Sequence, residues 1–210
     1  MLVDIKKIPM MWITHPKSLS YKESMKTMID LVGFENVTEI DGDSIDKEGL
    51  SFIEIQEKKT NAVAEAHIKA LKMHKAPFLI LEDDCALVDS ENIKTEFEVP
   101  DCDALYLGSH NYGMVRNVST RGGTISCYYD DDHIQVYNML GIHAILYMTD
   151  EYVQDSINYL QGCIDENRYC DECIALNMKS HDILALSSPI FYQKDGHNDE
   201  LTKTPVSPLF

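Results

Sequence analysis

Three consecutive acidic residues, Glu82-Asp83-Asp84, directly follow the apolar run Phe78–Leu81. A continuous apolar run is typical of a strand that is covered on both faces. Residues two apart in an extended backbone point to the same side, so Glu82 and Asp84 can share one face. Carboxylate oxygens in such a place suit Mg²⁺ or Mn²⁺, which can bridge a diphosphate to an acidic surface. The pattern favours a metal site over its alternative, a solvated acidic turn.

Two other polar segments end apolar stretches in the same way. Thr14-His15 ends the first apolar stretch of the chain, and Asp41-Gly42 ends the second. In a parallel sheet the carboxyl ends of the strands meet at one edge, and ligands bind beyond that edge. We therefore expect both segments to lie close to the acidic triplet, around one ligand.

The elements that position these segments follow from the apolar periodicity. Short apolar runs predict strands at Lys7–Ile13, Val37–Ile40, Phe78–Leu81, Ala104–Leu107, Ala144–Met148, Ile183–Leu186 and Ile190–Gln193. Helical spacing and capping residues predict helices from Ser20 to Gly33, over Asn61–His74, after Thr149 and over Asp171–Met178. The polar stretch 109–133 predicts a long surface loop. The alternation indicates an α/β fold, a three-layer α/β/α sandwich with a mostly parallel central sheet.

The charge balance limits the partners. The chain has 210 residues with 18 basic and 35 acidic side chains, which gives a formal charge of −17. Such a surface repels phosphate backbones and anionic lipid, so we expect no nucleic-acid partner and no non-specific membrane binding. An anionic ligand would need a local cation to offset this field.

Length and cysteine usage indicate a single cytoplasmic domain. No apolar run approaches the roughly 20 residues that span a bilayer, and the start of the chain lacks the apolar core of a signal peptide. The six cysteines are too few for a disulfide scaffold, so we expect free thiols. The ending, residues 204–210, resembles a linker, and we expect the domain to be excised from a longer polypeptide.

One block of sequence resembles a known family. The segment Ala66–Leu71, followed by the strand and acidic triplet of Pro77–Asp84, is similar to the lipooligosaccharide-type sugar transferases. In those enzymes a Ser-His-Leu-x-Ala helix leads into an apolar strand and a Glu-Asp-Asp motif. Weaker matches follow in the same order, so that the resemblance spans about residues 10–197; they are Trp12–Thr14 with Asp41-Gly42, Asp103–Gly108 and Pro189–Gln193. The family's arginines after the first strand are replaced here by His15, Lys17 and Lys22, and its Ser by Ala66.

The resemblance implies a GT-A fold and a glycosyltransferase, hexosyltransferase-like in type. The donor-binding half would cover about residues 1–108 and the acceptor half about 109–200. The enzyme would transfer a sugar from a nucleoside-diphosphate sugar, with UDP favoured, to a hydroxyl group of a glycan or glycoprotein acceptor. It would depend on Mn²⁺ or Mg²⁺.

The resemblance also assigns roles to particular residues. Asp84 would hold the metal ion, and Glu82 and Asp83 would contact the ribose and the sugar. The nucleotide-sugar site would further include Thr14, His15, Lys17, Asp41, Gly42 and His67. His67 lies on the apolar face of its helix, where a core histidine bonded to backbone is the alternative. His197 follows the last strand and would be a second metal ligand, unless it is an ordinary surface histidine.

The segment Cys170-Asp171-Glu172-Cys173 allows several interpretations. A single C-x-x-C is a weak signal for zinc or redox chemistry, and buried thiols on a helix are favoured. Its acidic pair resembles the acceptor-side carboxylate motif of GT-A enzymes. Asp171 would then take the proton of the acceptor hydroxyl or oppose a developing positive charge. The alternative is an acidic helix N-terminus with a purely structural role.

Two other functions remain open at this point. The first is a non-catalytic module of a larger protein that binds a nucleotide sugar or glycan. The second is a metal-dependent nucleotidyltransferase, which is disfavoured because no glycine-rich phosphate loop with basic residues follows the first strand.

Overall fold

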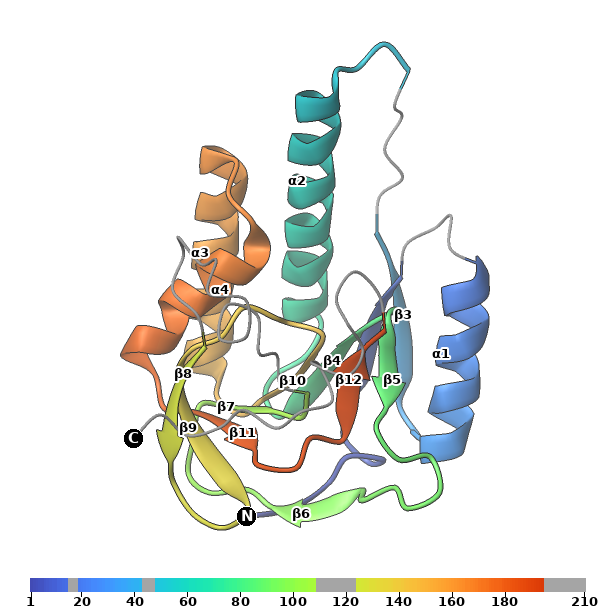
Figure 1. Ribbon diagram of the computed structural model, residues 1–210, viewed down its shortest axis with the longest axis vertical. Coiled ribbons are helices and arrows are strands. Elements are labelled where there is room, and N and C mark those ends of the chain that lie inside the picture. The colour runs from blue at the N-terminus through green and yellow to red at the C-terminus, as the bar shows by residue number, and fades with distance from the viewer. Residues whose placement is uncertain (15–18, 43–47, 109–123, 195–210) are drawn as a thin grey trace.

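The computed structural model describes residues 1–14, 19–42, 48–108 and 124–194 (Figure 1). Its strands are β1 (Leu2–Asp4), β2 (Met10–Thr14), β3 (Val37–Asp41), β4 (Phe78–Glu82), β5 (Cys85–Leu87), β6 (Glu96–Glu98), β7 (Ala104–Tyr106), β8 (Ile125–Tyr128), β9 (His133–Asn138), β10 (Ala144–Tyr147), β11 (Ile183–Leu186) and β12 (Phe191–Gln193). Its helices are α1 (Leu19–Val32), α2 (Phe52–Leu71), α3 (Asp150–Glu166) and α4 (Cys170–Asn177), with a short 3₁₀ turn at Met178–Ser180.

A central sheet of eight strands organises the described part of the chain. Its order is β3-β2-β4-β10-β7-β11-β9-β8. Strand β2 pairs in parallel with β3 and with β4, and β7 pairs in parallel with β11. Strands β10 and β9 run against their neighbours, so six of the eight strands point the same way. The mostly parallel sheet predicted from the sequence is confirmed.

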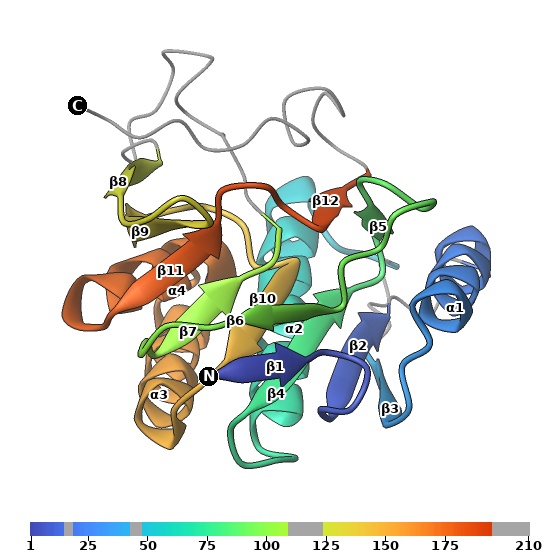
Figure 2. The same cartoon turned by 90° about the horizontal axis from the view of Figure 1, so that it is seen from below.

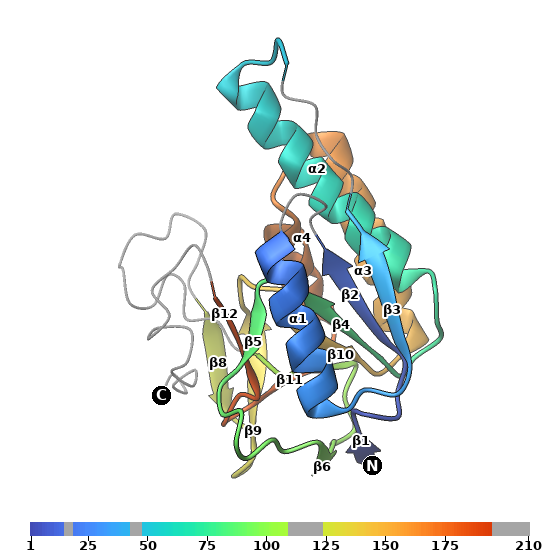
Figure 3. The same ribbon diagram turned by 90° about the vertical axis from the view of Figure 1, so that its right-hand side faces the viewer.

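Each face of this sheet carries its own apolar core, because successive residues of β4 alternate between the two faces. Phe78 and Ile80 pack in the core under α2, α3 and α4. Leu79 and Leu81 pack in the opposite core, which is covered by α1 and by the small sheets β1–β6 and β5–β12. Figures 2 and 3 show these layers on either side of the central sheet. The predicted three-layer α/β/α sandwich is therefore confirmed, with small sheets beside α1 in one outer layer.

Several element boundaries differ from the sequence prediction. Helix α2 begins at Phe52, nine residues before the predicted start at Asn61, and its N-terminus is closed by a capping box between Ser51 and Glu54. The charged residues after Ser51 hid this start, because they form the solvated side of a long helix. Helix α1 begins at Leu19, so Ser20 lies inside the helix and does not cap it.

The predicted loop 109–133 is wrong in its last part. Strands β8 and β9 form an antiparallel hairpin there, and residues 109–123 lie outside the described residues.

At the end of α1, Gly33 adopts a left-handed backbone with φ of 78°, and its N–H donates to the carbonyl of Ile29. This confirms the predicted glycine cap. Thr149 caps α3 as predicted, its hydroxyl accepting from the N–H of Tyr152.

The expectation of free thiols is wrong for one pair of cysteines. Cys163 in α3 and Cys173 in α4 form a disulfide, whose sulfur atoms come together because the two helices are consecutive and packed. Cys170 remains a free thiol, so the two cysteines of the C-x-x-C segment have different states. None of the described helices is both long and apolar enough to cross a membrane.

Candidate functional site

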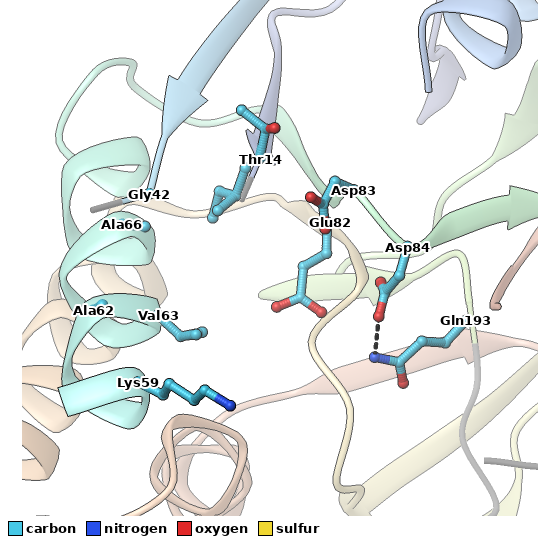
Figure 4. Close-up of a pocket in the computed structure, with 11 residues that line it drawn as sticks. Thr14, Gly42, Lys59, Ala62, Val63, Ala66, Glu82, Asp83, Asp84 and Gln193 are labelled. Atoms are coloured by element: carbon cyan, nitrogen blue, oxygen red, sulfur yellow. Dashed lines mark hydrogen bonds between the residues drawn. The ribbon is translucent and has the colours of Figure 1, made fainter. Parts of the chain in front are cut away.

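A pocket of about 420 Å³ opens at the edge of the sheet where the parallel strands β2, β3 and β4 end (Figure 4). It is lined by Ile13, Thr14, Gly42, Lys59, Ala62, Val63, Ala66, Glu82, Asp83, Asp84 and Gln193. The three segments that the sequence predicted to meet, at the ends of the first, second and third predicted strands, therefore line one pocket. The convergence follows from parallel strands that end at the same edge.

Helix α2 forms one wall of the pocket. Lys59, Ala62, Val63 and Ala66 are spaced at i, i+3, i+4 and i+7, which places them on one helix face. The small side chains of this face leave room between the helix and the strand ends. Lys59 extends from the same face into the space before Glu82 and Asp84 (Figure 4). Among the described residues that line the pocket, Lys59 carries the only positive charge.

Asp84 supplies a buried carboxylate to the opposite wall. Its Oδ2 accepts a hydrogen bond of 2.7 Å from Nε2 of Gln193, which β12 brings alongside by pairing with β5. Its Oδ1 is buried and has no hydrogen-bond partner within the described residues. Burial, reinforced by the negative charge of Glu82, raises the pKa of Asp84 to about 7. Among the described residues, no positively charged group is paired with this carboxylate.

Glu82 is held by a histidine of α2. Nε2 of the buried His67 lies 3.0 Å from Oε1 of Glu82. Burial alone would raise the pKa of Glu82. The hydrogen bond with His67 and the electrostatic influence of His67 and His143 instead hold this pKa below its usual value. His67 does not itself line the pocket. It is a buried histidine, as in the alternative interpretation of a core histidine, but its partner is a pocket carboxylate rather than a backbone group.

The ends of β2 and β3 contribute mostly backbone and small groups. The N–H of Gly42 donates to the carbonyl of Thr14 at 2.9 Å, and a Cβ at position 42 would lie only 3.1 Å from that oxygen. The Thr14 hydroxyl is buried and has no partner among the described residues. Asp41, in contrast, is about 70% exposed at its side chain, pairs with Lys22 at 3.2 Å, and does not line the pocket.

Asp171 lies at the start of α4, on the same side of the sheet as His67. Its Oδ1 accepts from the N–H of Glu172 at 2.9 Å. Burial, and after it the negative charges of Glu172 and Glu82, raises the pKa of Asp171. Asp171 is therefore in electrostatic contact with the site, but it is not one of the residues that line the pocket.

The metal site stays a prediction. His15, Lys17 and His197 lie outside the described residues, so nothing is learned of the predicted second ligand. Within the described ranges, no group of three or more His, Cys, Asp and Glu side chains is placed to hold a metal ion. The orphaned oxygen of Asp84 nevertheless fits a hard cation, since Mg²⁺ commonly takes one or two carboxylates and completes its shell with substrate phosphates and water.

Sequence reasoning missed two residues of this region. Lys59 shares the helical spacing of Ala62, Val63 and Ala66, and this signal was hidden by the late predicted start of the helix. His143, next to Glu82 across the β4–β10 pair, carried no recognisable pattern, because it stands alone before a strand.

Comparisons with known proteins give only weak likeness. No family model matches the chain, and no curated protein matches it. Among solved structures, a nucleoside-diphosphate-sugar pyrophosphorylase from Vibrio cholerae RC9 is similar, with a TM-score of 0.42 and 8% identity over 86% of this chain and 73% of that one. A glycosyltransferase involved in the glycosylation of the major capsid of PBCV-1 is also similar, with a TM-score of 0.38 and 11% identity over 91% of this chain and 95% of that one.

Proposed function

We propose that the protein is a metal-dependent glycosyltransferase that transfers a sugar from a nucleoside-diphosphate sugar, with UDP favoured, to a hydroxyl group of a glycan or glycoprotein. The observation that carries the proposal is the buried Asp84 carboxylate with an orphaned oxygen, set in a pocket that faces Lys59. The resemblance of the surrounding residues to the lipooligosaccharide-type sugar transferases supports the same reaction.

The charges of the pocket favour a ligand that arrives with a cation. Glu82, Asp83 and Asp84 would repel a diphosphate, and the chain as a whole carries a charge of −17. Asp84 would hold a divalent ion, whose charge would offset the local negative field, and the Lys59 ammonium adds a positive charge from the opposite wall. Asp84 would thus bind a diphosphate through the ion, and Lys59 would bind it directly.

The other residues have roles that follow from their positions. Thr14 and Gly42 line the pocket at the ends of β2 and β3 and would contact the nucleoside. The resemblance adds His15, Lys17 and Asp41 to this part of the proposed site. Glu82 and Asp83 would bind hydroxyl groups of the ribose and the sugar, and His67 fixes the orientation of Glu82. When bound, Mn²⁺ or Mg²⁺ would stabilise the negative charge of the departing diphosphate. His197 is proposed as its second protein ligand.

Asp171 is proposed as the group that accepts the proton of the acceptor hydroxyl or opposes positive charge on the sugar. Its raised pKa suits a carboxylate that must take up a proton. One observation favours the alternative of a non-catalytic nucleotide-sugar or glycan-binding module, because Asp171 does not line the pocket. The two candidates differ in turnover and agree on binding.

The test is donor binding and hydrolysis with and without the metal. We expect a UDP-sugar with Mn²⁺ to raise the melting temperature. At 100 times its dissociation constant, the ligand should add about 2.7 kcal/mol to the free energy of unfolding. EDTA should abolish both the shift and the hydrolysis. Equal UDP affinity in Mn²⁺ and in EDTA would contradict the proposal. Binding without turnover across a panel of donors and acceptors would favour the binding module.

A further inference from the structure

His143 lies beside Glu82 on the central sheet. Strand β10 pairs antiparallel with β4, in the register Ile145 with Ile80 and Ala144 with Leu81. The next pair is His143 with Glu82, and the N–H of Glu82 donates to the carbonyl of His143 at 3.0 Å. Directly opposed residues of an antiparallel pair lie on the same face. The imidazole therefore lies next to the Glu82 side chain, on the face covered by α2 and α4.

The imidazole of His143 has no internal partner. The residue is 1% exposed, and within the described residues neither ring nitrogen makes a hydrogen bond. Burial lowers the pKa of His143 to about 4, against the opposite influence of Glu82, so the ring is neutral at pH 7. A buried polar group without a partner costs about 1–3 kcal/mol, and such groups are rare enough that each calls for an explanation.

Gly108 makes the space that this ring occupies. It follows β7, next to His143, and a Cβ at position 108 would collide with Nε2 and lie 2.8 Å from Cδ2 of the imidazole. Any other residue at 108 would displace the ring. The backbone on one side and Glu82 on the other thus fix an unpaired imidazole at the inner end of the site.

We propose that His143 and Glu82 together recognise two adjacent hydroxyl groups of the sugar carried by the donor. This inference rests on the proposed function. Glu82 lines the pocket and His143 lies beside it on the same face of the sheet, so a hydroxyl group that displaces the Glu82 carboxylate would meet the imidazole. A neutral imidazole donates one hydrogen bond and accepts another, as a hydroxyl group does, whereas the carboxylate only accepts. The pair therefore distinguishes a sugar diol from a nucleotide phosphate.

The test compares the free nucleotide with the nucleotide sugar by titration calorimetry in Mn²⁺. The probes are UDP-glucose, UDP-galactose, UDP-N-acetylglucosamine and GDP-mannose, each beside its own nucleoside diphosphate. In His143→Leu we expect about tenfold weaker binding of the preferred nucleotide sugar, the size of a lost hydrogen bond, and unchanged binding of the nucleoside diphosphate. The melting temperature should not fall, because the lost ring had no partner. His74→Leu, on an exposed histidine, is the matched control.

A second pair of variants tests the same idea through Gly108. Gly108→Ala should weaken sugar binding as His143→Leu does, because its Cβ displaces the ring. In a His143→Ala background it should add no further loss, since the space is vacated. Its other close contact, 3.1 Å to the carbonyl of Phe191, is the same in both backgrounds. His143→Asn keeps a hydrogen-bond donor and an acceptor, so it should bind the nucleotide sugar more tightly than His143→Leu does.

The outcomes separate the two proposals. Wild-type protein that binds no nucleotide and no nucleotide sugar would overturn the proposed function. If the wild-type protein binds the nucleoside diphosphate and the nucleotide sugar, the His143→Leu variant decides the role of His143. Unchanged affinity for both ligands, or an equal loss for both, would overturn that role. Additive losses for Gly108→Ala and His143→Ala would overturn it as well.

Discussion

Two clusters of histidine and carboxylate occupy opposite edges of the same sheet. One is the His67–Glu82 pair with Asp84, at the edge where the parallel strands end. The other joins His181 to Asp103 and Asp155, at the edge where β7 and β11 begin. Both contain a buried imidazole within hydrogen-bond distance of a carboxylate, so residue type alone does not tell them apart.

The clusters differ in how completely their polar atoms are paired. Both oxygens of Asp103 are bonded, one to the Thr149 hydroxyl at 2.7 Å and the other to the N–H of Asp182 at 3.0 Å. The two ring nitrogens of His181 lie 3.3 Å and 3.2 Å from carboxylate oxygens of Asp103 and Asp155. This cluster ties β7, α3 and β11 together, and both oxygens of Asp103 and both ring nitrogens of His181 are paired.

The first cluster leaves polar atoms unpaired around a pocket. Asp84, Thr14 and His143 each keep a buried atom without a hydrogen-bond partner within the described residues. The pKa of Asp84 is raised by burial to about 7, whereas that of Asp103 is lowered, because its hydrogen bonds outweigh the effect of burial. The pairing of histidine and carboxylate atoms, more than their presence, therefore distinguishes the pocket cluster from the Asp103 cluster.

The largest expected effect is that of Asp84→Asn. This change keeps the volume of the side chain and removes the charge that would hold the cation, so metal-dependent donor binding should be abolished. The melting temperature should be kept, because the charged form of Asp84 is already disfavoured by burial. Calorimetry with a UDP-sugar in Mn²⁺ and in EDTA gives the answer. Wild-type affinity in the variant would move the metal site elsewhere.

Asp171→Asn should have the next largest effect. If Asp171 accepts a proton or stabilises positive charge, kcat should fall by roughly a hundredfold or more while donor affinity barely changes. The control is Glu172→Gln, one residue along the same first turn of α4. A role confined to the helix N-terminus would make both changes mild, at about 0.3–1 kcal/mol of stability. Full transfer activity with a lower melting temperature would assign Asp171 to that structural role.

Lys59→Met should weaken donor binding by about tenfold or more, which corresponds to losing one charge-assisted hydrogen bond. The methionine keeps most of the length of the side chain and removes the ammonium. Lys58→Met, on the neighbouring residue of α2 that does not line the pocket, is the matched control and should bind the donor as wild type does. Equal losses in both variants would show a general effect of net charge rather than a contact in the pocket.

The sequence predicted most of the sheet and only part of the site. Apolar runs such as Phe78–Leu81 are read correctly because a strand covered on both faces has little choice of residue. The start of α2 was missed because its exposed turns carry the same charged residues as a loop. Strands β1, β5 and β6 were missed because each is three residues long and is defined by its partner strand, whereas the equally short β7 and β12 belong to the predicted runs Ala104–Leu107 and Ile190–Gln193.

The site illustrates the same limit. The strand ends at Thr14, Gly42 and the acidic triplet meet because β2, β3 and β4 run in the same direction. The alternation of predicted strands and helices indicates this parallel arrangement. The pairing of Gln193 with Asp84 depends on β12 lying beside β5, a contact between residues 109 positions apart. The disulfide between Cys163 and Cys173 depends in the same way on how α3 and α4 pack, and composition argued against it. Local pattern thus finds the strand ends, and tertiary pairing decides which groups they meet.

The smallest effect on activity is expected from the paired cluster. Asp103→Asn should leave donor binding and turnover unchanged, because Asp103 lies at the opposite edge of the sheet from the pocket. It should lower stability by about 1–3 kcal/mol, since it weakens the bonds to Thr149 and His181. Thermal unfolding and donor titration on the same sample measure both. Loss of activity without loss of stability would break the distinction between the two clusters.

The pH dependence of stability should differ in sign between the clusters. The pKa of Asp103 is lowered in the folded state, so its contribution is present above about pH 4 and is lost as the pH falls through the folded pKa. Asp84, with a folded pKa of about 7, holds its proton where the unfolded chain releases it. Its contribution therefore declines as the pH rises from about 4 to about 7. In EDTA, the free energy of unfolding of Asp103→Asn should approach the wild-type value at acid pH. That of Asp84→Asn should increase relative to the wild-type value as the pH rises toward 7. Parallel pH profiles for the two variants would show that pairing does not separate these clusters.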